Sequence, residues 1–193
     1  MAEDKDRELT ILGFAGSLRR ASLNRALLRA LQEETPAGMK IEIFDIGEIP
    51  LFNEDVEAAG VPEAVERFRQ AIQAADGVVI STPEYNHGVP GVTKNAIDWA
   101  SRPPRQSPLD GKPVAILGAS PGITGTARGQ SQLRQAFEFT NSYCMPQPEI
   151  LVYQAHQKFD AEGRLTDAKT REFLGKFLAA FAQWVRRLAP EKP

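Results

Sequence analysis

Short apolar segments alternate with amphipathic segments along almost the whole chain, and this alternation restricts the fold more than any other feature. The apolar segments lie at residues 10–15, 39–46, 78–81, 114–117 and 150–153. The amphipathic segments have apolar residues at helical spacing and lie at 22–35, 62–75, 89–101, 126–141 and 167–188. Strands and helices in this strict alternation indicate a parallel sheet covered by helices on both faces.

The character of each strand predicts the order of the sheet. The second segment alternates apolar and polar residues, as an edge strand does, whereas the first, third and fourth are fully apolar and belong inside. With right-handed crossovers, the order 2-1-3-4-5 satisfies both conditions. We therefore predict an α/β fold with a flavodoxin-like, doubly wound, five-stranded parallel sheet. Its switch point lies between strands one and three, where ligands bind beyond the carboxyl ends of the strands.

Composition narrows the classes of partner. The 193 residues suit one domain, which we place at residues 10–188 between a charged tail at 1–9 and a short tail at 189–193. A net charge of −2 gives no reason to expect nucleic acid or an anionic membrane surface, and no apolar run approaches the roughly 20 residues of a membrane helix. Six consecutive charges near the start do not fit a secretion signal. The single cysteine, Cys144, excludes an intrachain disulfide and fits a cytoplasmic location.

The first strand-to-helix loop has the composition of an anion site. Residues 16–24 place the side chains of Ser17, Ser22 and Asn24 at the expected start of a helix. Unpaired N–H groups and the helix dipole favour an anion there. Four arginines and no acid lie between residues 10 and 32, which suits a phosphate of about two charges. The alternative is that Ser22 only caps the helix and the arginines form a solvated face.

Two further loops bring polar groups to the same edge of the sheet. Pro83-Glu84-Tyr85-Asn86 follows the third strand, and a glycine-rich stretch at 118–125 follows the fourth. Proline and asparagine also form ordinary turns, but glycine lets backbone approach a ligand closely. Three such loops at one edge predict a site for one flat, phosphorylated ligand. The loops match neither the P-loop pattern nor G-x-G-x-x-G, so neither a nucleotide hydrolase nor a tightly held dinucleotide is predicted.

A serine hydrolase is an alternative reading of the third loop, because Gly118-Ala119-Ser120-Pro121-Gly122 fits G-x-S-x-G. That chemistry needs the backbone N–H of the residue after the serine, and Pro121 has none. His156 is the only histidine after Ser120, and no acid is defined between them. Two histidines and one cysteine are too few for a typical zinc site, so no metal is predicted.

Three motifs in order resemble the NAD(P)H-dependent FMN reductases, a family that includes quinone, chromate and azo-dye reductases. They are Gly16-Ser17-Leu18-Arg19-x-x-Ser22-x-Asn24, then Pro83-Glu84-Tyr85-Asn86-x-x-x-Pro90-Gly91-x-x-Lys94-Asn95-Ala96-x-Asp98-Trp99, then Gly118-Ala119-Ser120-Pro121-Gly122. The resemblance spans about residues 10–185. One departure is Thr93, where the family often has leucine.

The resemblance implies bound FMN and a ping-pong reaction in which NAD(P)H reduces a quinone, azo compound, chromate-like oxyanion or free flavin. No catalytic side chain is implied, since the cofactor carries the chemistry. By position, Ser17, Arg19, Ser22 and Asn24 would hold the phosphate; Pro83, Glu84, Tyr85 and Asn86 would border the ring; and Ser120 and Gly122 would contact the ring or ribityl chain. It also implies a homodimer or homotetramer, for which the wide apolar face of the last helix at Leu174 and Leu178 is a weaker indication. An FMN-binding electron carrier without NAD(P)H turnover is the main alternative.

Overall fold

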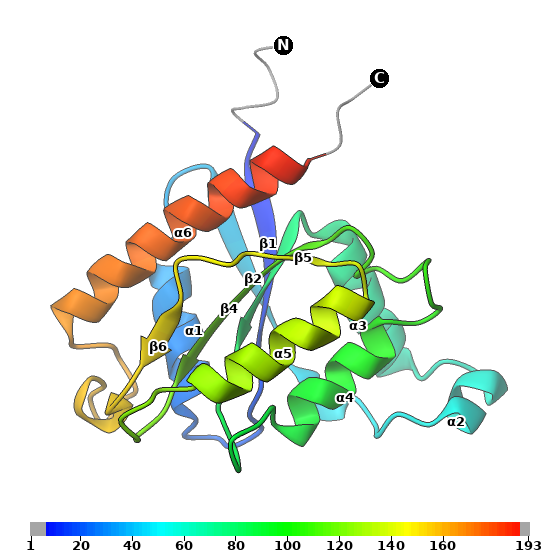
Figure 1. Cartoon of the computed structure of the whole chain (residues 1–193), viewed down its shortest axis with the longest axis horizontal. Coiled ribbons are helices and arrows are strands. Elements are labelled where there is room, and N and C mark those ends of the chain that lie inside the picture. Colours follow the sequence, from blue (N-terminus) through cyan, green and yellow to red (C-terminus); the bar gives the residue numbers. More distant parts are fainter. Residues whose placement is uncertain (1–6, 190–193) are drawn as a thin grey trace.

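Parallel strands form one sheet in the computed structural model, which describes residues 7–189 (Figure 1). The strand order is β2-β1-β3-β4, and both β5 and β6 pair with the far side of β4. The strands are β1 Leu9–Ala15, β2 Met39–Phe44, β3 Gly77–Ser81, β4 Pro113–Ala119, β5 Tyr143–Cys144 and β6 Ile150–Val152. The predicted order 2-1-3-4-5 is confirmed, with the fifth position shared between the short strand β5 and the predicted strand β6.

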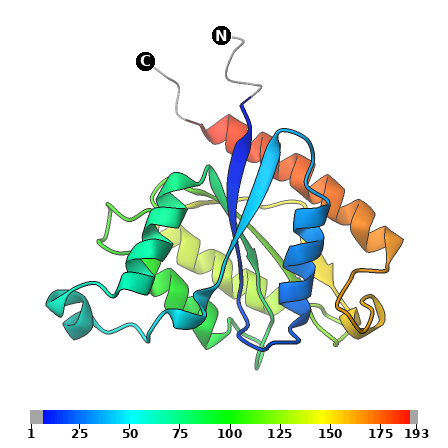
Figure 2. The same cartoon turned by 180° about the vertical axis from the view of Figure 1, so that it is seen from behind.

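Helices cover both faces of this sheet. They are α1 Leu23–Glu33, α2 Glu54–Ala59, α3 Glu63–Ala74, α4 Gly91–Ala100, α5 Ala127–Phe139 and α6 Ala168–Leu188. In Figures 1 and 2, α1 and α6 lie on one side of the strands and α3, α4 and α5 on the other. Alternate residues of β1 explain this arrangement, because Ile11 packs in the core beneath α1 and α6 while Leu12 and Phe14 pack beneath α3, α4 and α5.

The segment at 47–61 differs from the long loop that the sequence predicts. A 3₁₀ turn at Ile46–Glu48 and the short helix α2 lie there, and α2 stands out from the body of the molecule in both views (Figures 1 and 2). α2 buries no residue of its own. It is fastened by Glu57, whose carboxylate accepts hydrogen bonds from Arg69 Nη2 at 2.9 Å and Arg102 Nε at 3.0 Å. A helix held in this way has no apolar periodicity for a sequence pattern to reveal.

The buried face of α6 includes Phe177 and Phe181, whereas Phe173 is 44% exposed. Leu174 and Leu178 are buried against the sheet of the same chain, so they are not a spare apolar surface. Their use as an indication of oligomerisation was therefore wrong. None of the helices within residues 7–189 is long and apolar enough to cross a membrane.

The predicted ends of the domain shift slightly. Leu9, the last residue of the predicted N-terminal tail, belongs to β1 and is buried. The first strand of the domain therefore begins at Leu9 and not at residue 10. Most of the two predicted tails, residues 1–6 and 190–193, lies outside the described residues.

Candidate functional site

The carboxyl ends of three adjacent strands open into the three loops that the sequence singles out. We call residues 16–22 after β1 loop one, residues 82–90 after β3 loop two, and residues 120–126 after β4 loop three. Because β1, β3 and β4 are parallel neighbours, these loops meet at one edge of the sheet, the lower edge in Figure 1. The structure thus brings the predicted site residues to one place, at the switch point between β1 and β3.

Loop one presents hydrogen-bond donors that have no acceptor. The backbone N–H groups of Ser17, Leu18, Arg20 and Ala21 have no acceptor among residues 7–189. The Ser22 hydroxyl oxygen accepts from the backbone N–H groups of Asn24 and Arg25 at 3.2 and 3.3 Å. Its own hydroxyl proton is therefore available. Successive free N–H groups beside a helix N-terminus form an anion-binding surface.

The arginines near loop one divide into two kinds. Arg25 is committed to Asp45, with Arg25 Nη2 and Asp45 Oδ2 2.6 Å apart, so it does not contribute to an anion site as the sequence suggested. Arg19 and Arg20 are exposed, and neither guanidinium forms an ion pair within residues 7–189. Positive charge free to meet an incoming anion therefore lies on loop one itself.

Asn24 ties the start of α1 to the ends of β3 and β4 rather than facing outwards. It is 2% exposed; its Nδ2 donates to Ala119 O at 2.8 Å, and its Oδ1 accepts from Ala119 N at 2.8 Å and from Ser81 Oγ at 3.2 Å. The start of α1 is thereby tied to the ends of β4 and β3. Three of the four hydrogen bonds that an asparagine amide can make are used inside the protein.

Loop two is a tight turn fastened to α5. Tyr85 and Gly88 exchange two backbone hydrogen bonds, from Tyr85 N to Gly88 O at 3.1 Å and from Gly88 N to Tyr85 O at 2.9 Å. Asn86 and His87 between them have φ values of 51° and 63°, the two left-handed positions of a type I′ turn. The Tyr85 side chain is 53% exposed, while Pro83 is buried. The turn therefore presents an aromatic ring at the edge of the site.

Glu84 caps α5 instead of facing a ligand. Its Oε2 accepts from the backbone N–H groups of Arg128 and Gly129 at 2.9 and 3.0 Å, and its Oε1 accepts from Arg128 Nε at 2.8 Å. Burial alone would raise the pKa of Glu84, but the hydrogen bonds from Gly129 and Arg128 together with the Arg128 charge outweigh it and lower the pKa. Arg128 was missed in the sequence, although a cation in the first turn of a helix opposes the helix dipole and is a signal for an acidic partner.

We expect Glu84→Gln to destabilise the protein by about 2 kcal/mol at neutral pH, because an amide would turn a donor towards the N–H groups of α5. A carboxyl whose pKa is lower in the folded state stabilises above its unfolded pKa, and this contribution is lost as pH falls through the folded pKa. The difference between the two proteins in urea unfolding should therefore shrink below about pH 4. A difference independent of pH would contradict this role for Glu84.

Loop three places Ser120 beside the site without the partners of a nucleophile. Its Oγ accepts from Gly122 N at 3.1 Å, so the Gly122 N–H is used within the loop. The His156 ring lies 3.4 Å from Gln157 Nε2, and no histidine within residues 7–189 hydrogen bonds to Ser120. The hydrolase alternative therefore lacks both a general base and, at Pro121, an oxyanion donor.

Two buried threonines lie under loop one, and no pattern in the sequence assigned either of them a role in the site. Thr82 and Thr93 are fully buried, and their hydroxyl oxygens lie 3.2 Å apart. A Cβ at Gly16 would lie 2.0 Å from Thr93 Oγ1 and 2.9 Å from Thr82 Oγ1, so only glycine fits. Thr93 is the departure from the resemblance noted above, and its hydroxyl sets how closely loop one approaches α4.

Other titratable groups add no reactive side chain to this edge. Burial raises the pKa of the Cys144 thiol to about 11, despite the nearby Arg134 charge, so the thiol stays protonated at neutral pH. Within residues 7–189, His, Cys, Asp and Glu side chains form no cluster that could hold a metal ion. The site thus offers positioned donors and an aromatic ring, which suits binding a reactive cofactor.

Comparisons with known proteins agree with this geometry. The family model of NADPH-dependent FMN reductases matches residues 9–157. An NAD(P)H-dependent FMN reductase of Pseudomonas aeruginosa is 53% identical over 181 residues, covering 94% of this chain and 97% of the relative. A quinone reductase of Escherichia coli K12 is 42% identical, with 94% and 97% covered. Among solved structures, the flavoenzyme NAD(P)H:(acceptor) oxidoreductase of Paracoccus denitrificans has a TM-score of 0.85 and 39% identity, covering 93% of this chain and 98% of that one.

Proposed function

Because this chain belongs to the NADPH-dependent FMN reductase family, we propose that it uses NAD(P)H to reduce quinones through bound FMN. FMN as cofactor and NAD(P)H as co-substrate follow from the family, and so does the class of oxidoreductase. The proposal extends the acceptors to azo compounds, chromate-like oxyanions and free flavin, and it holds that NAD(P)H and acceptor use the site in turn. The observation that carries it is the row of unsatisfied donors in loop one, at the switch point between β1 and β3.

The phosphate of FMN would be held by loop one. The free N–H groups, the hydroxyl protons of Ser17 and Ser22, and the guanidinium of Arg19 supply donors and positive charge at the start of α1. Hydrogen bonds from charged donors to phosphate are stronger than neutral ones. Asn24 takes part indirectly in this proposal, because its amide holds the strand ends that carry these donors.

The ring would lie against loops two and three. Pro83 and Tyr85 would supply an apolar and aromatic edge, Asn86 a polar group beside them, and Ser120 with Gly122 the opposite side. Glu84 acts at a distance, by fixing loop two to the start of α5. FMN, when bound, supplies hydride acceptance from NAD(P)H and electron donation to the acceptor. The chain's own contribution is to orient the ring and leave one side accessible, since the Tyr85 ring and residues 121–124 are exposed.

The test compares Arg19→Ala with Arg25→Ala in FMN titrations, followed by stopped-flow mixing with NADPH. We expect Arg19→Ala to weaken FMN binding by about 10- to 100-fold, since a charged hydrogen bond is worth about 1.5–3 kcal/mol. Arg25→Ala should stay near wild type, because its charge is already paired with Asp45. NADPH should bleach the flavin absorbance of the wild-type protein, and a quinone should restore it. Bound flavin that NADPH does not bleach would favour the electron carrier, and failure to bind FMN would overturn the proposal.

Assembly into a homodimer or homotetramer is also proposed, on grounds other than α6. Leu51, Ile123 and Phe139 are 84%, 79% and 87% exposed, and large apolar side chains exposed to this degree favour association. Light scattering of the FMN-loaded protein measures the state directly. A cytoplasmic location is part of the same proposal, and it rests on the single cysteine.

A further inference from the structure

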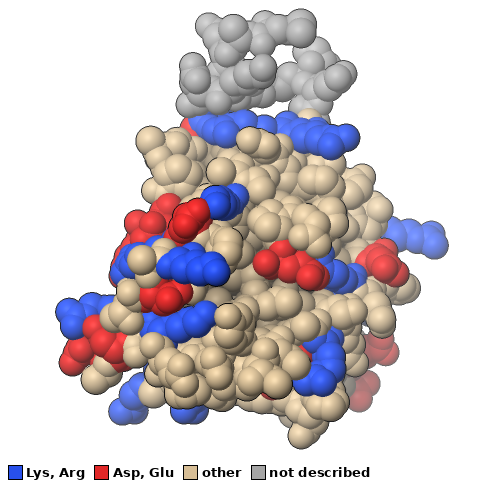
Figure 3. All heavy atoms as spheres, turned by 60° about the vertical axis from the view of Figure 1, so that its left-hand side comes forward, with Lys and Arg blue, Asp and Glu red and all other residues tan. Residues whose placement is uncertain are grey.

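A cavity lies between β6 and the first half of α6, on β6 next to loop three, whose Ser120 N donates to Val152 O at 2.9 Å. Its volume is about 610 Å³, within the range of small-molecule sites. Its lining comes from residues 147–153, which include β6, from Lys158 and Asp167 between β6 and α6, and from the first half of α6, and it includes no residue of loops one to three. Figure 3 turns the side that carries β6 and the start of α6 forward, and both basic and acidic side chains border the uncharged surface there.

Two exposed aromatic rings in this cavity each have ammonium groups beside them. Lys158 Nζ lies 4.3 Å from the centre of the Tyr153 ring. Lys169 Nζ and Lys176 Nζ each lie 5.8 Å from the centre of the Phe173 ring. Tyr153 is 50% exposed and Phe173 44% exposed, so both rings remain accessible to a ligand. Apolar walls with cations at the rim are suited to a ligand that is itself aromatic and anionic.

The lysines of the cavity outnumber its acidic side chains, and two of the lysines form no ion pair. Asp167 Oδ2 accepts from the backbone N–H and the hydroxyl of Thr170 at 2.8 and 2.6 Å, and Glu149 pairs with Arg134 at 3.9 Å. Lys176 pairs with Glu172 outside the lining. Lys158 and Lys169 form no ion pair within residues 7–189. Hydrogen bonds from Thr170, and then the charges of Lys158 and Lys169, lower the pKa of Asp167, which caps the N-terminus of α6. The Asp167 carboxylate therefore offsets part of the positive charge, and three lysines against two carboxylates leave the lining with a net positive charge.

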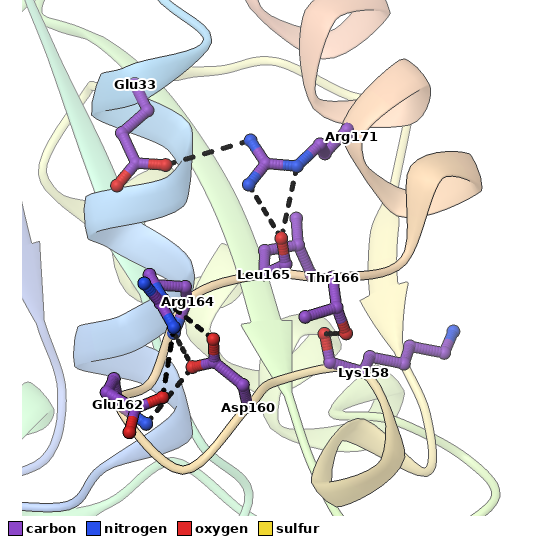
Figure 4. Close-up of polar contacts among 8 residues, drawn as sticks. All are labelled: Glu33, Lys158, Asp160, Glu162, Arg164, Leu165, Thr166 and Arg171. Carbon is purple, nitrogen blue, oxygen red and sulfur yellow. Dashed lines mark hydrogen bonds and ion pairs between the residues drawn. The ribbon is translucent and has the colours of Figure 1, made fainter.

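The backbone of Lys158 is held by the segment that precedes α6, in which Phe159 pairs with Leu165 in antiparallel fashion. Figure 4 shows Arg171 donating to Leu165 O, at 3.1 Å from Nε and 2.6 Å from Nη2, and Thr166 Oγ1 donating to Lys158 O at 3.1 Å. The backbone of Lys158 is thus held to the base of α6. Its side chain extends away from these bonds, and its ammonium group takes no part in any contact drawn there (Figure 4). The Lys158 ammonium group is positioned without forming an ion pair, which lowers the cost of binding an anion.

We propose that this cavity is a second ligand site, separate from the flavin site, for a small aromatic anion such as an aryl carboxylate or aryl sulfonate. The arene would lie between the Tyr153 and Phe173 rings over β6, and the anionic group would meet Lys158 and Lys169. No covalent step is involved. The site would allow an aromatic acid to bind the FMN-loaded enzyme without entering the redox site.

The experiment titrates the FMN-loaded protein with a fluorescent anilinonaphthalene sulfonate and with N-phenylnaphthylamine, its uncharged counterpart. We expect one sulfonate probe per chain, bound more tightly than the uncharged arene and more weakly as salt is raised. Lys158→Met with Lys169→Met should reduce sulfonate affinity about tenfold and remove the preference for it, because methionine keeps the apolar stem but not the charge. Lys40→Met, on the opposite edge strand β2, is the matched control and should change nothing.

Three results would overturn the proposal. Equal affinity for the charged and uncharged arenes would mean that the cavity is only an apolar hollow. Displacement of the probe by excess FMN, or loss of probe binding in Arg19→Ala, would place the probe in the flavin site. Absence of binding to a correctly folded protein would remove the site altogether. FMN content is measured separately from probe binding. A protein that binds FMN but not the sulfonate probe would therefore contradict only the second site, and the proposed reductase function would stand.

Discussion

Replacing Gly118 by alanine is expected to destabilise the protein by about 3 kcal/mol and to abolish FMN binding, and no single side-chain truncation should restore it. A Cβ at this position would lie 2.1 Å from Thr126 Oγ1 and 2.4 Å from the backbone oxygen of Thr82. The side-chain clash can be removed, but the backbone clash forces β4 away from loop two. Since β4 carries loop three, two of the three loops of the flavin site would be displaced together.

Gly16 provides the matched comparison, because its obstacles are side-chain atoms. Gly16→Ala should also destabilise, through the 2.0 Å approach to Thr93 Oγ1, but Thr93→Ala removes that atom. A double-mutant cycle of Gly16 with Thr93 should therefore show a favourable coupling of about 1 kcal/mol or more, whereas the cycle of Gly118 with Thr126 should show much less. Urea unfolding and FMN titration of the single and double variants measure both cycles. Equal rescue in the two cycles would mean that the Thr82 carbonyl can move aside, contrary to this expectation.

These glycines show what a sequence can and cannot say about the site. Glycine in a strand-end loop indicates a close approach, and the sequence suggested that the approaching group is a ligand. At Gly118 the approaching groups are instead Thr82 and Thr126 of the same chain. A glycine in a loop indicates that another group approaches the backbone closely at that position. Which group approaches depends on the packing of segments that are far apart in the sequence.

The fold was more predictable than the site, for a physical reason. Strand order follows from which strands are apolar on both faces, and that is a local property of β1, β3 and β4. The roles of Glu84 and Glu57 are not local. Glu84 caps a helix 44 residues further on, and Glu57 pairs with Arg102, 45 residues away. No spacing rule connects such partners. In the sequence, a glutamate that pairs with a distant part of the same chain therefore cannot be distinguished from a glutamate that faces a ligand.

Asn24→Leu is expected to cost about 3 kcal/mol of stability and to weaken FMN binding as a consequence. Leucine fills the same space but leaves the N–H and C=O of Ala119 and the hydroxyl of Ser81 buried without their partner. Desolvated polar groups without partners are costly, and here they lie at the ends of β3 and β4. We therefore expect the Asn24→Leu apoprotein to unfold at a lower urea concentration than the wild-type apoprotein, as measured by urea titration in the absence of FMN.

Asn95 is a natural control, because its amide makes the same kind of backbone bonds away from the three strand ends. Its Oδ1 accepts from Phe52 N at 2.7 Å and its Nδ2 donates to Pro50 O at 2.8 Å, but the side chain is partly exposed. Water can replace these bonds, so Asn95→Leu should cost only about 1 kcal/mol and leave FMN affinity near wild type. If Asn24 instead holds the phosphate directly, as the sequence motif suggested, Asn24→Leu would lower FMN affinity while apoprotein stability matches that of Asn95→Leu. The order of the two apoprotein midpoints therefore separates a residue that binds the cofactor from one that holds the cofactor's loops in place.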